Sequence, residues 1–342
     1  MLHTHTHTHT LLGLDKDSTL SYAYSADLAA LSSCLNLHPP TLPAYLTRIT
    51  TPLKVNAWAT HLATHPDRAF ASYIIDGLSH GFRIGFDHQY HICRPAASNH
   101  PSALEHPSVI SERLEAEVSK GRLIGPLNPT EFPEVQTSSL GAVPKKHSEN
   151  KWRLILDLSH PKASSVNDGI DRSMCSLTYM KVDDVVRKVL AMGKGSLLAK
   201  IDVESAFRNV PVHPHDRHLL GMKWDGQLYV DTVLPFGLRS APKIFNCIAD
   251  ALQWIAKERG VTWLEHFLDD FVTVGAPRSS ECKDNLQLLV STCIILDIPL
   301  AVTKSEGPTT CLTFLVIEVD TEKMELRLPA EKLHRLQSLL QK

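Results

Sequence analysis

The spacing of hydrophobic and polar positions divides the chain into a helical first part and a second part that mixes strands with helices. In the first part, one helix is predicted between an Asp67 N-cap and a stop at Gly77 or Gly81. A second helix is predicted from a Ser108 cap onwards, after a Pro- and Ser-rich linker at residues 94–107. The apolar face of the first helix is formed by Ala69, Phe70, Tyr73, Ile74 and Leu78.

From Ser138 onwards the pattern changes to alternation with a period of two, which is typical of strands. Hairpins are predicted at residues 138–158, 218–234, 262–274 and 312–328, the last with its turn at 320–323. Helices are predicted at 182–192, at 239–259, from Ser279 or Ser280 to about 296, and from 331 to the end. This mixture lacks the regular strand–helix alternation of a doubly wound sheet, so it predicts an α+β fold with an antiparallel sheet backed by helices.

Two adjacent carboxylates, Asp269 and Asp270, stand between apolar, strand-like flanks, which places them at or near a hairpin tip. Alone, such a pair is most often a solvated turn. A third carboxylate, Asp202, ends an apolar run that reads as a buried strand. Three carboxylates on neighbouring strand ends suit hard divalent cations such as magnesium. Two such ions about 3.5–4 Å apart clamp the attacking and leaving oxygens of a phosphoryl transfer.

Composition limits the remaining classes of protein. The 342 residues contain 35 Lys and Arg against 37 Asp and Glu, a net charge of −2, so any basicity that attracts nucleic acid is local. One basic cluster surrounds the first predicted hairpin tip and consists of Lys145, Lys146, Lys151 and Arg153. The seven cysteines are scattered without a Cys-x-x-Cys pair, which favours a reducing compartment. No apolar run of membrane-spanning length and no signal peptide is evident, so we expect an intracellular protein, cytoplasmic or nuclear, without a membrane partner.

The first 50 residues are predicted to be a disordered, low-complexity leader. They contain a tract of alternating His and Thr at residues 3–10. Alternating histidines are also a possible transition-metal ligand set, and that alternative stays open.

Five segments in order resemble the motifs of retroelement reverse transcriptases, most closely those of DIRS-type retrotransposons. They are Asp202-Val203-Glu204-Ser205-Ala206-Phe207, Leu234-Pro235-Phe236-Gly237, Phe267-Leu268-Asp269-Asp270, Leu300-Ala301-Val302-Thr303-Lys304 and Leu312-Thr313-Phe314-Leu315-Val316-Ile317. The resemblance extends over residues 121–339, and more loosely back to residue 52. Five motifs in one order are far more specific than a single match.

This resemblance implies a right-hand polymerase with fingers and palm at residues 108–328. A helical N-terminal extension and linker would occupy 51–107, and 329–342 would begin a truncated thumb or connection. The chain would then be a piece of a longer polyprotein or a truncated copy. The implied activity is RNA-directed DNA polymerisation with two Mg²⁺ ions, or Mn²⁺. The implied partners are an RNA or DNA template with its primer and dNTPs, and the oligomeric state stays open.

The resemblance also implies individual roles. The implied metal ligands are Asp202, Asp269, Asp270 and the Val203 carbonyl, and the implied nucleotide-binding residues are Lys146, Arg153, Phe207, Phe236, Gly237 and Lys304. Lys146 and Arg153 would neutralise the triphosphate, the arginine through a forked contact. Phe207 would exclude the 2′-hydroxyl of a ribonucleotide. The alternative is that Phe207 is an ordinary core residue. Lys304 would donate a proton to pyrophosphate, with a surface lysine as its alternative.

Two departures from the family pattern stand out. Phe267 replaces a common tyrosine but keeps the ring. Val316 stands where the family usually has glycine, and a β-branched residue is strained if φ is positive there. A catalytically inactive relic or a domesticated nucleic-acid-binding module with the same fold is therefore an alternative function. An RNA-directed RNA polymerase is a third, disfavoured by Phe207 and the Leu-Pro-Phe-Gly run.

Overall fold

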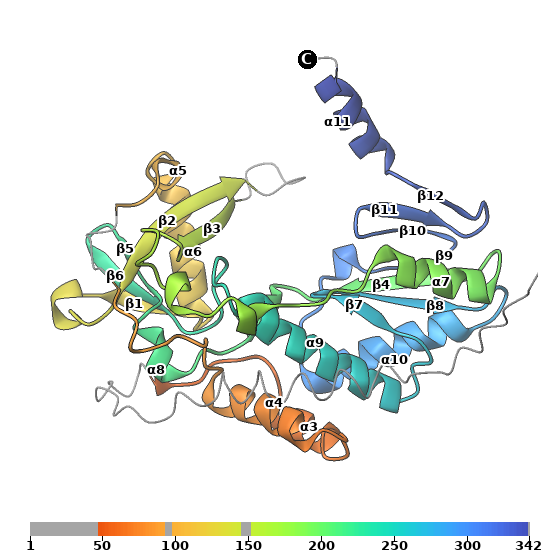
Figure 1. Cartoon of the computed structure of the whole chain (residues 1–342), viewed down its shortest axis with the longest axis horizontal. Helices are drawn as coiled ribbons and strands as arrows, with labels where there is room; N and C mark the ends of the chain where they lie inside the picture. Colours follow the sequence, from red (N-terminus) through yellow and green to blue (C-terminus); the bar gives the residue numbers. More distant parts are fainter. Residues whose placement is uncertain (1–46, 93–97, 145–151, 341–342) are drawn as a thin grey trace, which may run out of the picture.

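The computed structural model describes residues 47–92, 98–144 and 152–340. These residues form two sheet-bearing parts, and helix α9 (Ala241–Glu258) begins between them and extends beneath the second (Figure 1). The predicted leader lies almost entirely outside the described residues. Across the described ranges, no helix combines the length and hydropathy needed to span a bilayer.

The first part is built on a five-stranded sheet with the order β1-β6-β5-β2-β3. Its strands are β1 (Leu123–Leu127), β2 (Thr137–Pro144), β3 (Trp152–Asp157), β5 (Gly221–Trp224) and β6 (Gln227–Asp231). Strands β2 and β5 run parallel, and the other pairs are antiparallel. The β5–β6 turn is Asp225-Gly226, and both residues have positive φ, as the sequence predicted for a tight hairpin.

The second part is a four-stranded antiparallel sheet with the order β7-β8-β4-β9. Its strands are β4 (Leu197–Asp202), β7 (Glu265–Phe267), β8 (Asp270–Gly275) and β9 (Glu306–Thr309). Helices α9 and α10 (Glu281–Leu296) cover one face, and α7 (Val182–Met192) lies on the other (Figure 1). Two separate clusters of buried apolar side chains, one on each face, match this arrangement. The predicted antiparallel sheet backed by helices is therefore confirmed.

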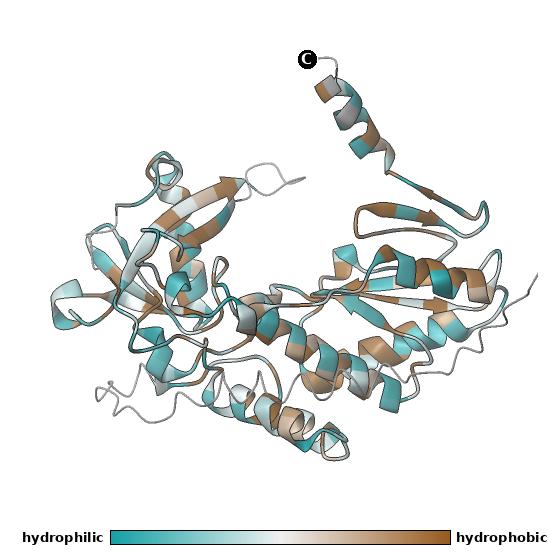
Figure 2. Ribbon diagram, in the orientation of Figure 1, coloured by the Kyte–Doolittle hydropathy of each residue, from teal (hydrophilic) through white to brown (hydrophobic). Residues whose placement is uncertain are grey.

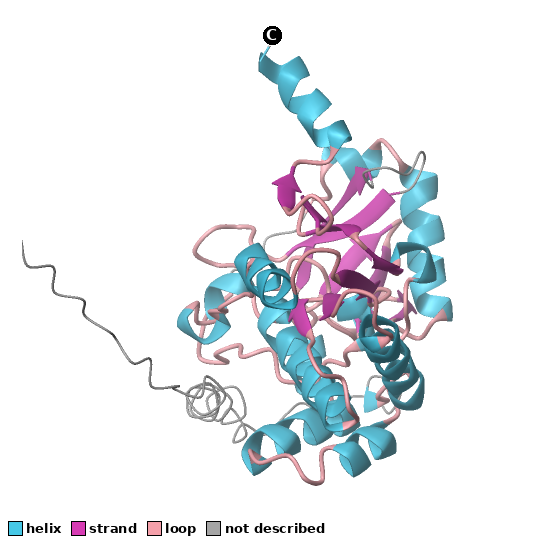
Figure 3. Cartoon of the chain, turned by 90° about the vertical axis from the view of Figure 1, so that its right-hand side faces the viewer, coloured by secondary structure: helices cyan, strands magenta, loops and turns pink. Residues whose placement is uncertain are grey.

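A third, three-stranded sheet follows, with β10 (Cys311–Phe314), β11 (Ile317–Asp320) and β12 (Glu325–Arg327). The sequence predicted one hairpin here, which is wrong in detail, because a second tight turn at Leu315-Val316 separates β10 from β11. Helix α11 (Ala330–Leu340) then projects away from the body (Figures 1 and 3). It carries both hydrophobic and hydrophilic positions (Figure 2), and Leu333 and Leu339 are exposed.

Helices α3 (Val55–His61) and α4 (Arg68–His80) pack against the second part, where the Trp58 indole donates a hydrogen bond to the Leu296 carbonyl. Asp67 caps α4 as predicted, since its side chain accepts from the Phe70 N–H at 2.9 Å. Gly81, with φ +88°, ends the helix. The shorter helices are α5 (Pro101–Leu104), α8 (Pro214–Arg217), η1 (Pro129–Glu131), η2 (Asn167–Gly169), η3 (Ser173–Cys175), η4 (Ala206–Asn209) and η5 (Val302–Lys304).

The segment before α6 (Pro107–Ser119) differs from its prediction in two ways. The helix begins at Pro107, so the predicted Ser108 cap is wrong; proline suits a first helical position because that position needs no N–H donor. The described end of the predicted linker is also not free. Asn99 and Ser102 accept hydrogen bonds from the backbone of Leu140 and Ala142, so the segment packs along β2.

Candidate active site

The strand register brings the three predicted carboxylates to one end of the four-stranded sheet. Asp202 is the last residue of β4 and lies opposite Asp270, the first residue of β8. Phe267 pairs with Asp270, so Leu268 and Asp269 form a two-residue turn between β7 and β8. The prediction that Asp202 ends a buried strand and that the acidic pair sits at a hairpin tip is confirmed.

The electrostatics of these carboxylates are coupled. Burial, and then the charges of Asp269 and Asp202, raise the pKa of Asp270 to about 6. Burial raises the pKa of Asp269 as well, and the Asp202 charge adds to that rise. The site therefore concentrates negative charge that a cation would stabilise.

A cation of the chain itself already contacts this site. The Lys304 ammonium lies 2.9 Å from both carboxylate oxygens of Asp202, although the lysine side chain is 63% exposed. Within the described ranges, no three Asp, Glu, His or Cys side chains converge as a metal-ligand set. The three carboxylates are neighbours in the sheet, but in this structure, with the Lys304 ammonium on Asp202, their oxygens do not converge on one point. As a donor set, three carboxylates still fit magnesium, which takes oxygen ligands.

The Val203 backbone faces the turn that holds Asp269. Its N–H donates to the Asp269 carbonyl at 3.0 Å. Its neighbours Asp202 and Glu204 make the hydrogen bonds to the 299–301 segment on the opposite side. In an extended strand the N–H and C=O of one residue point to the same edge, so the Val203 carbonyl is on the side of the turn.

A second cation approaches the site from β4 itself. Lys200 precedes Asp202 by two residues, so strand alternation puts both on one face. Its ammonium donates to the Thr313 carbonyl at 2.7 Å, and its charge opposes the rise of the Asp270 pKa. Lys200 is not among the residues predicted from the sequence, although its period-two spacing from Asp202 was a usable signal.

Arg153 on β3 is exposed and lies opposite Val143 in the β2–β3 hairpin. Its positive charge counteracts the rise of the Asp269 pKa, so the arginine is within electrostatic range of the carboxylates. Lys146 and the rest of the hairpin tip lie outside the described residues.

Three aromatic rings cluster around η4, the short helix that follows Asp202 in the chain. The ring of Phe207, on η4, lies 5.6 Å from that of Phe236 and 5.7 Å from that of Phe245 on α9. Phe236 is 42% exposed, whereas Phe245 is buried. Phe207 therefore contacts one core ring and one exposed ring. This position is compatible both with the predicted contact to the nucleotide sugar and with an ordinary core role.

Gly237 has a structural reason to be glycine. Its φ is +101°, and a Cβ atom there would lie 2.5 Å from the Leu156 carbonyl oxygen of β3. Asn167, which the sequence analysis missed, holds the same loop: its amide donates to the Gly237 carbonyl and accepts from the Arg239 N–H, both at 2.8 Å. An Asn before Asp-Gly is a common loop signal, so the sequence did not single it out.

The turn that carries Val316 adopts the strained geometry that its missing glycine suggested. Val316 has φ +76° and Leu315 has φ +46°. Both residues lie in the left-handed region, which β-branched and bulky side chains rarely adopt.

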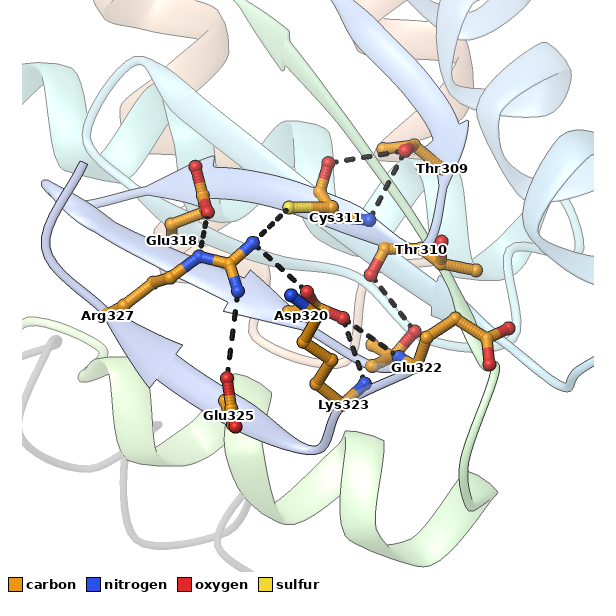
Figure 4. Close-up of polar contacts among 10 residues, drawn as sticks. Thr309, Thr310, Cys311, Glu318, Asp320, Glu322, Lys323, Glu325 and Arg327 are labelled. Carbon is orange, nitrogen blue, oxygen red and sulfur yellow. Dashed lines mark hydrogen bonds and ion pairs between the residues drawn. The ribbon is translucent and has the colours of Figure 1, made fainter. Parts of the chain in front are cut away.

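One arginine ties together the strands on either side of this turn (Figure 4). The Arg327 guanidinium on β12 contacts Glu318, lies 3.0 Å from an Asp320 carboxylate oxygen and 3.7 Å from one of Glu325. It also donates to the Cys311 sulfur at 3.5 Å. All three strands of the third sheet are therefore linked by a single side chain, which we call the Arg327 cluster.

Comparisons with known proteins agree with this geometry. The model of the family "Reverse transcriptase (RNA-dependent DNA polymerase)" matches residues 143–319, just over half of the chain. The chain is 25% identical over 151 residues to the "Retrovirus-related Pol polyprotein from transposon 412" of Drosophila melanogaster, covering 43% of this chain and 11% of that protein.

Solved structures share the fold. The foamy viral protease-reverse transcriptase dRH in complex with ds DNA superposes with a TM-score of 0.57 at 17% identity, over 90% of this chain and 52% of that one. The foamy viral protease-reverse transcriptase in complex with dsDNA gives 0.54 at 16% identity, over 85% and 59%. The chain thus spans little more than half of these structures and a small part of the polyprotein. Its α+β architecture is the fingers and palm of a right-hand polymerase, and the chain belongs to the reverse transcriptase family.

Proposed function

We propose that this chain is the RNA-directed DNA polymerase domain of a DIRS-type retrotransposon. The observation that carries the proposal is the β4–β8 register, which puts Asp202 beside Asp270 and the Asp269 turn. In this proposal residues 51–107 are a helical extension, 108–328 the fingers and palm, and 329–342 the start of a thumb. Template, primer and dNTPs would bind between the Arg153 hairpin and the carboxylates.

Magnesium or manganese ions, held by Asp202, Asp269, Asp270 and the Val203 carbonyl, would activate the primer 3′-hydroxyl and stabilise the leaving pyrophosphate. Arg153 and Lys146 bind the triphosphate by charge and, for the arginine, by a forked contact. Phe207 and Phe236 contact the sugar and the base of the incoming nucleotide. Lys304, whose exposed side chain reaches Asp202, delivers a proton to the leaving group.

The test is primer extension on an RNA template with magnesium and dNTPs. We expect the wild-type chain to extend the primer and the Asp202→Asn variant to fold but not to extend. Equal extension by both proteins would contradict the assigned site, and preferential use of ribonucleotides would point to an RNA polymerase.

A second candidate function is a nucleic-acid-binding module that has lost activity. The positive φ of Val316 favours it, because a strained turn stands where the family usually has glycine. A wild-type chain that binds an RNA–DNA duplex but extends no primer, even after Val316→Gly, would support this candidate.

A further inference from the structure

A group of buried charges at the junction of fingers and palm has no role in the proposed chemistry. Its centre is Arg208, which directly follows Phe207 on η4 and whose side chain is 11% exposed. The guanidinium contacts Glu117 of α6 at 2.8 and 2.9 Å and an Asp231 oxygen of β6 at 2.6 Å. Three elements that are distant in sequence therefore meet at the residue next to the predicted sugar contact.

A second arginine extends this network to the next residue of η4. Arg122 donates to the Asn209 side-chain oxygen at 2.9 Å and lies 3.8 Å from the other carboxylate oxygen of Glu117. The Asn209 amide donates in turn to the Glu204 carbonyl at 2.8 Å. Glu117 thus stands between two arginines, and both residues after Phe207 are anchored to the fingers.

The short helix η4 needs such anchoring. It has four residues, and the residue before it, Ser205 in the N-cap position, has φ +53° and makes no side-chain cap. Backbone hydrogen bonds in one turn of 3₁₀ helix give weak local stability. Burial lowers the pKa of Arg208, but the charges of Asp231 and Glu117 outweigh this and raise the pKa overall, so the arginine keeps its charge. Burial also raises the pKa of Asp231 to about 6, and the Arg208 charge opposes that rise.

The ring of Phe207 is positioned by η4 between exposed Phe236 and buried Phe245. If the Arg208 contacts were lost, η4 would no longer be tied to α6, and the ring could shift relative to Phe236. A misplacement on the order of 1 Å changes the rates of reaction steps markedly.

We propose that Arg208, through Glu117 and Asp231, is a positioning residue that holds Phe207 in place and so determines the discrimination between deoxy- and ribonucleotides. This inference rests on the proposed function. It also assigns part of the sugar selectivity to the fingers helix α6, which has no contact with the carboxylates in the proposed mechanism.

The test measures kcat/KM for a dNTP and for the matching rNTP, with the full chain on one template–primer. Arg208→Met and Glu117→Gln should each lower the dNTP preference by roughly tenfold. Arg208→Lys should retain part of the preference, because an ammonium can contact Glu117 or Asp231 but cannot bridge both as the guanidinium does. Arg187→Met is the matched control, since Arg187 pairs with its neighbour Asp184 on the exposed face of α7 and the change should leave the ratio unchanged.

A double-variant cycle with Phe207→Val separates positioning from general stability. In the Phe207→Val background, Arg208→Met should cause no further change in the ratio, because both changes act through the same ring. Equal losses for both nucleotides, with the ratio preserved, would overturn the inference and make the network purely structural. If Arg208→Met does not fold, Glu117→Gln decides by the same criterion. A wild-type chain that extends no primer would instead contradict the proposed function.

Discussion

The β7–β8 and β10–β11 hairpins of this protein both place bulky residues in the left-handed region of their turns, but the contacts around the two turns differ. Each has a two-residue turn with a bulky residue in the left-handed region: Leu268 at φ +53° in the first, and Leu315 and Val316 at +46° and +76° in the second. The β5–β6 hairpin has the same geometry as the second but uses Asp225-Gly226, which tolerates it.

The difference lies in the surroundings. The first turn is pinned by a backbone hydrogen bond from Val203 to the Asp269 carbonyl and by the central pairing of β8 with β4. The second turn is exposed, with Val316 49% accessible. Its strands pair with each other and with β12 in the three-stranded sheet, and the Arg327 cluster links all three strands. Backbone strain persists where the surrounding structure determines the conformation, and such sites concentrate at functional positions. In the proposed function the first strained turn presents the Asp269 carboxylate, whereas no catalytic role is proposed for the second turn.

The largest expected effect tests the functional half of this comparison. Asp269→Asn should reduce primer extension by at least about a thousandfold, because the change removes a proposed metal ligand while the turn keeps its shape. Asp225→Asn is the matched control, since it removes a carboxylate from another tight turn and should leave extension unchanged. Steady-state extension rates, with circular dichroism as the folding check, give the answer. Comparable activity of the two variants would remove the distinction between the hairpins.

The next effect concerns the second turn. Val316→Gly should raise the free energy of unfolding by about 1 kcal/mol, because the left-handed conformation costs a non-glycine residue about 1–2 kcal/mol and glycine returns part of this as chain entropy. Urea unfolding measures the change. Val143→Gly, at an exposed valine within strand β2, is the control and should destabilise the protein. If Val316→Gly does not raise the free energy of unfolding, the positive φ of Val316 is not a source of strain.

Local signals predicted much of the fold. The helix at Val182–Met192, the Asp67 cap and the Asp225-Gly226 turn follow from hydrophobic spacing and from residues with strong turn or cap preferences. The Leu315-Val316 turn was missed for the converse reason. Neither residue is a turn former, so only the strand pairing around it reveals the turn.

The site was predictable only in part. The motif resemblance singled out the carboxylates, and the alternation of the strands placed them at one sheet end. The contact of Lys304 with Asp202, the hold of Asn167 on Gly237 and the anchoring of η4 by Arg208 join residues that are far apart in sequence. Such contacts depend on how whole elements pack, and no local pattern encodes them.

A smaller effect tests whether repulsion among Asp270, Asp269 and Asp202 destabilises the first hairpin. The pKa of Asp270 is raised to about 6, first by burial and then by Asp269 and Asp202, with Lys200 and Lys304 opposing. The folded state therefore binds the proton more tightly than the unfolded chain, so in a chelator this group makes stability fall as pH rises from about 4 to about 6. Asp270→Asn should remove that fall and raise the melting temperature at pH 7.5 by about 2 °C or more. A lower melting temperature than wild type would show that the carboxylate stabilises the hairpin.

The smallest effect tests the second hairpin's dependence on the Arg327 cluster. Arg327→Met removes the guanidinium shared by Glu318, Asp320 and Glu325, and it leaves these carboxylates facing one another. We expect a modest decrease in melting temperature at low ionic strength. At about 1 M salt the Debye length is about 3 Å, so both the lost attraction and the new repulsion are screened and the decrease should nearly vanish. Arg187→Met, which removes an exposed arginine that pairs with Asp184 on its own helix, should change little at either salt concentration. A decrease that is independent of salt would mean that Arg327 acts by packing its stem, and the cluster would then not be an electrostatic support of the second hairpin.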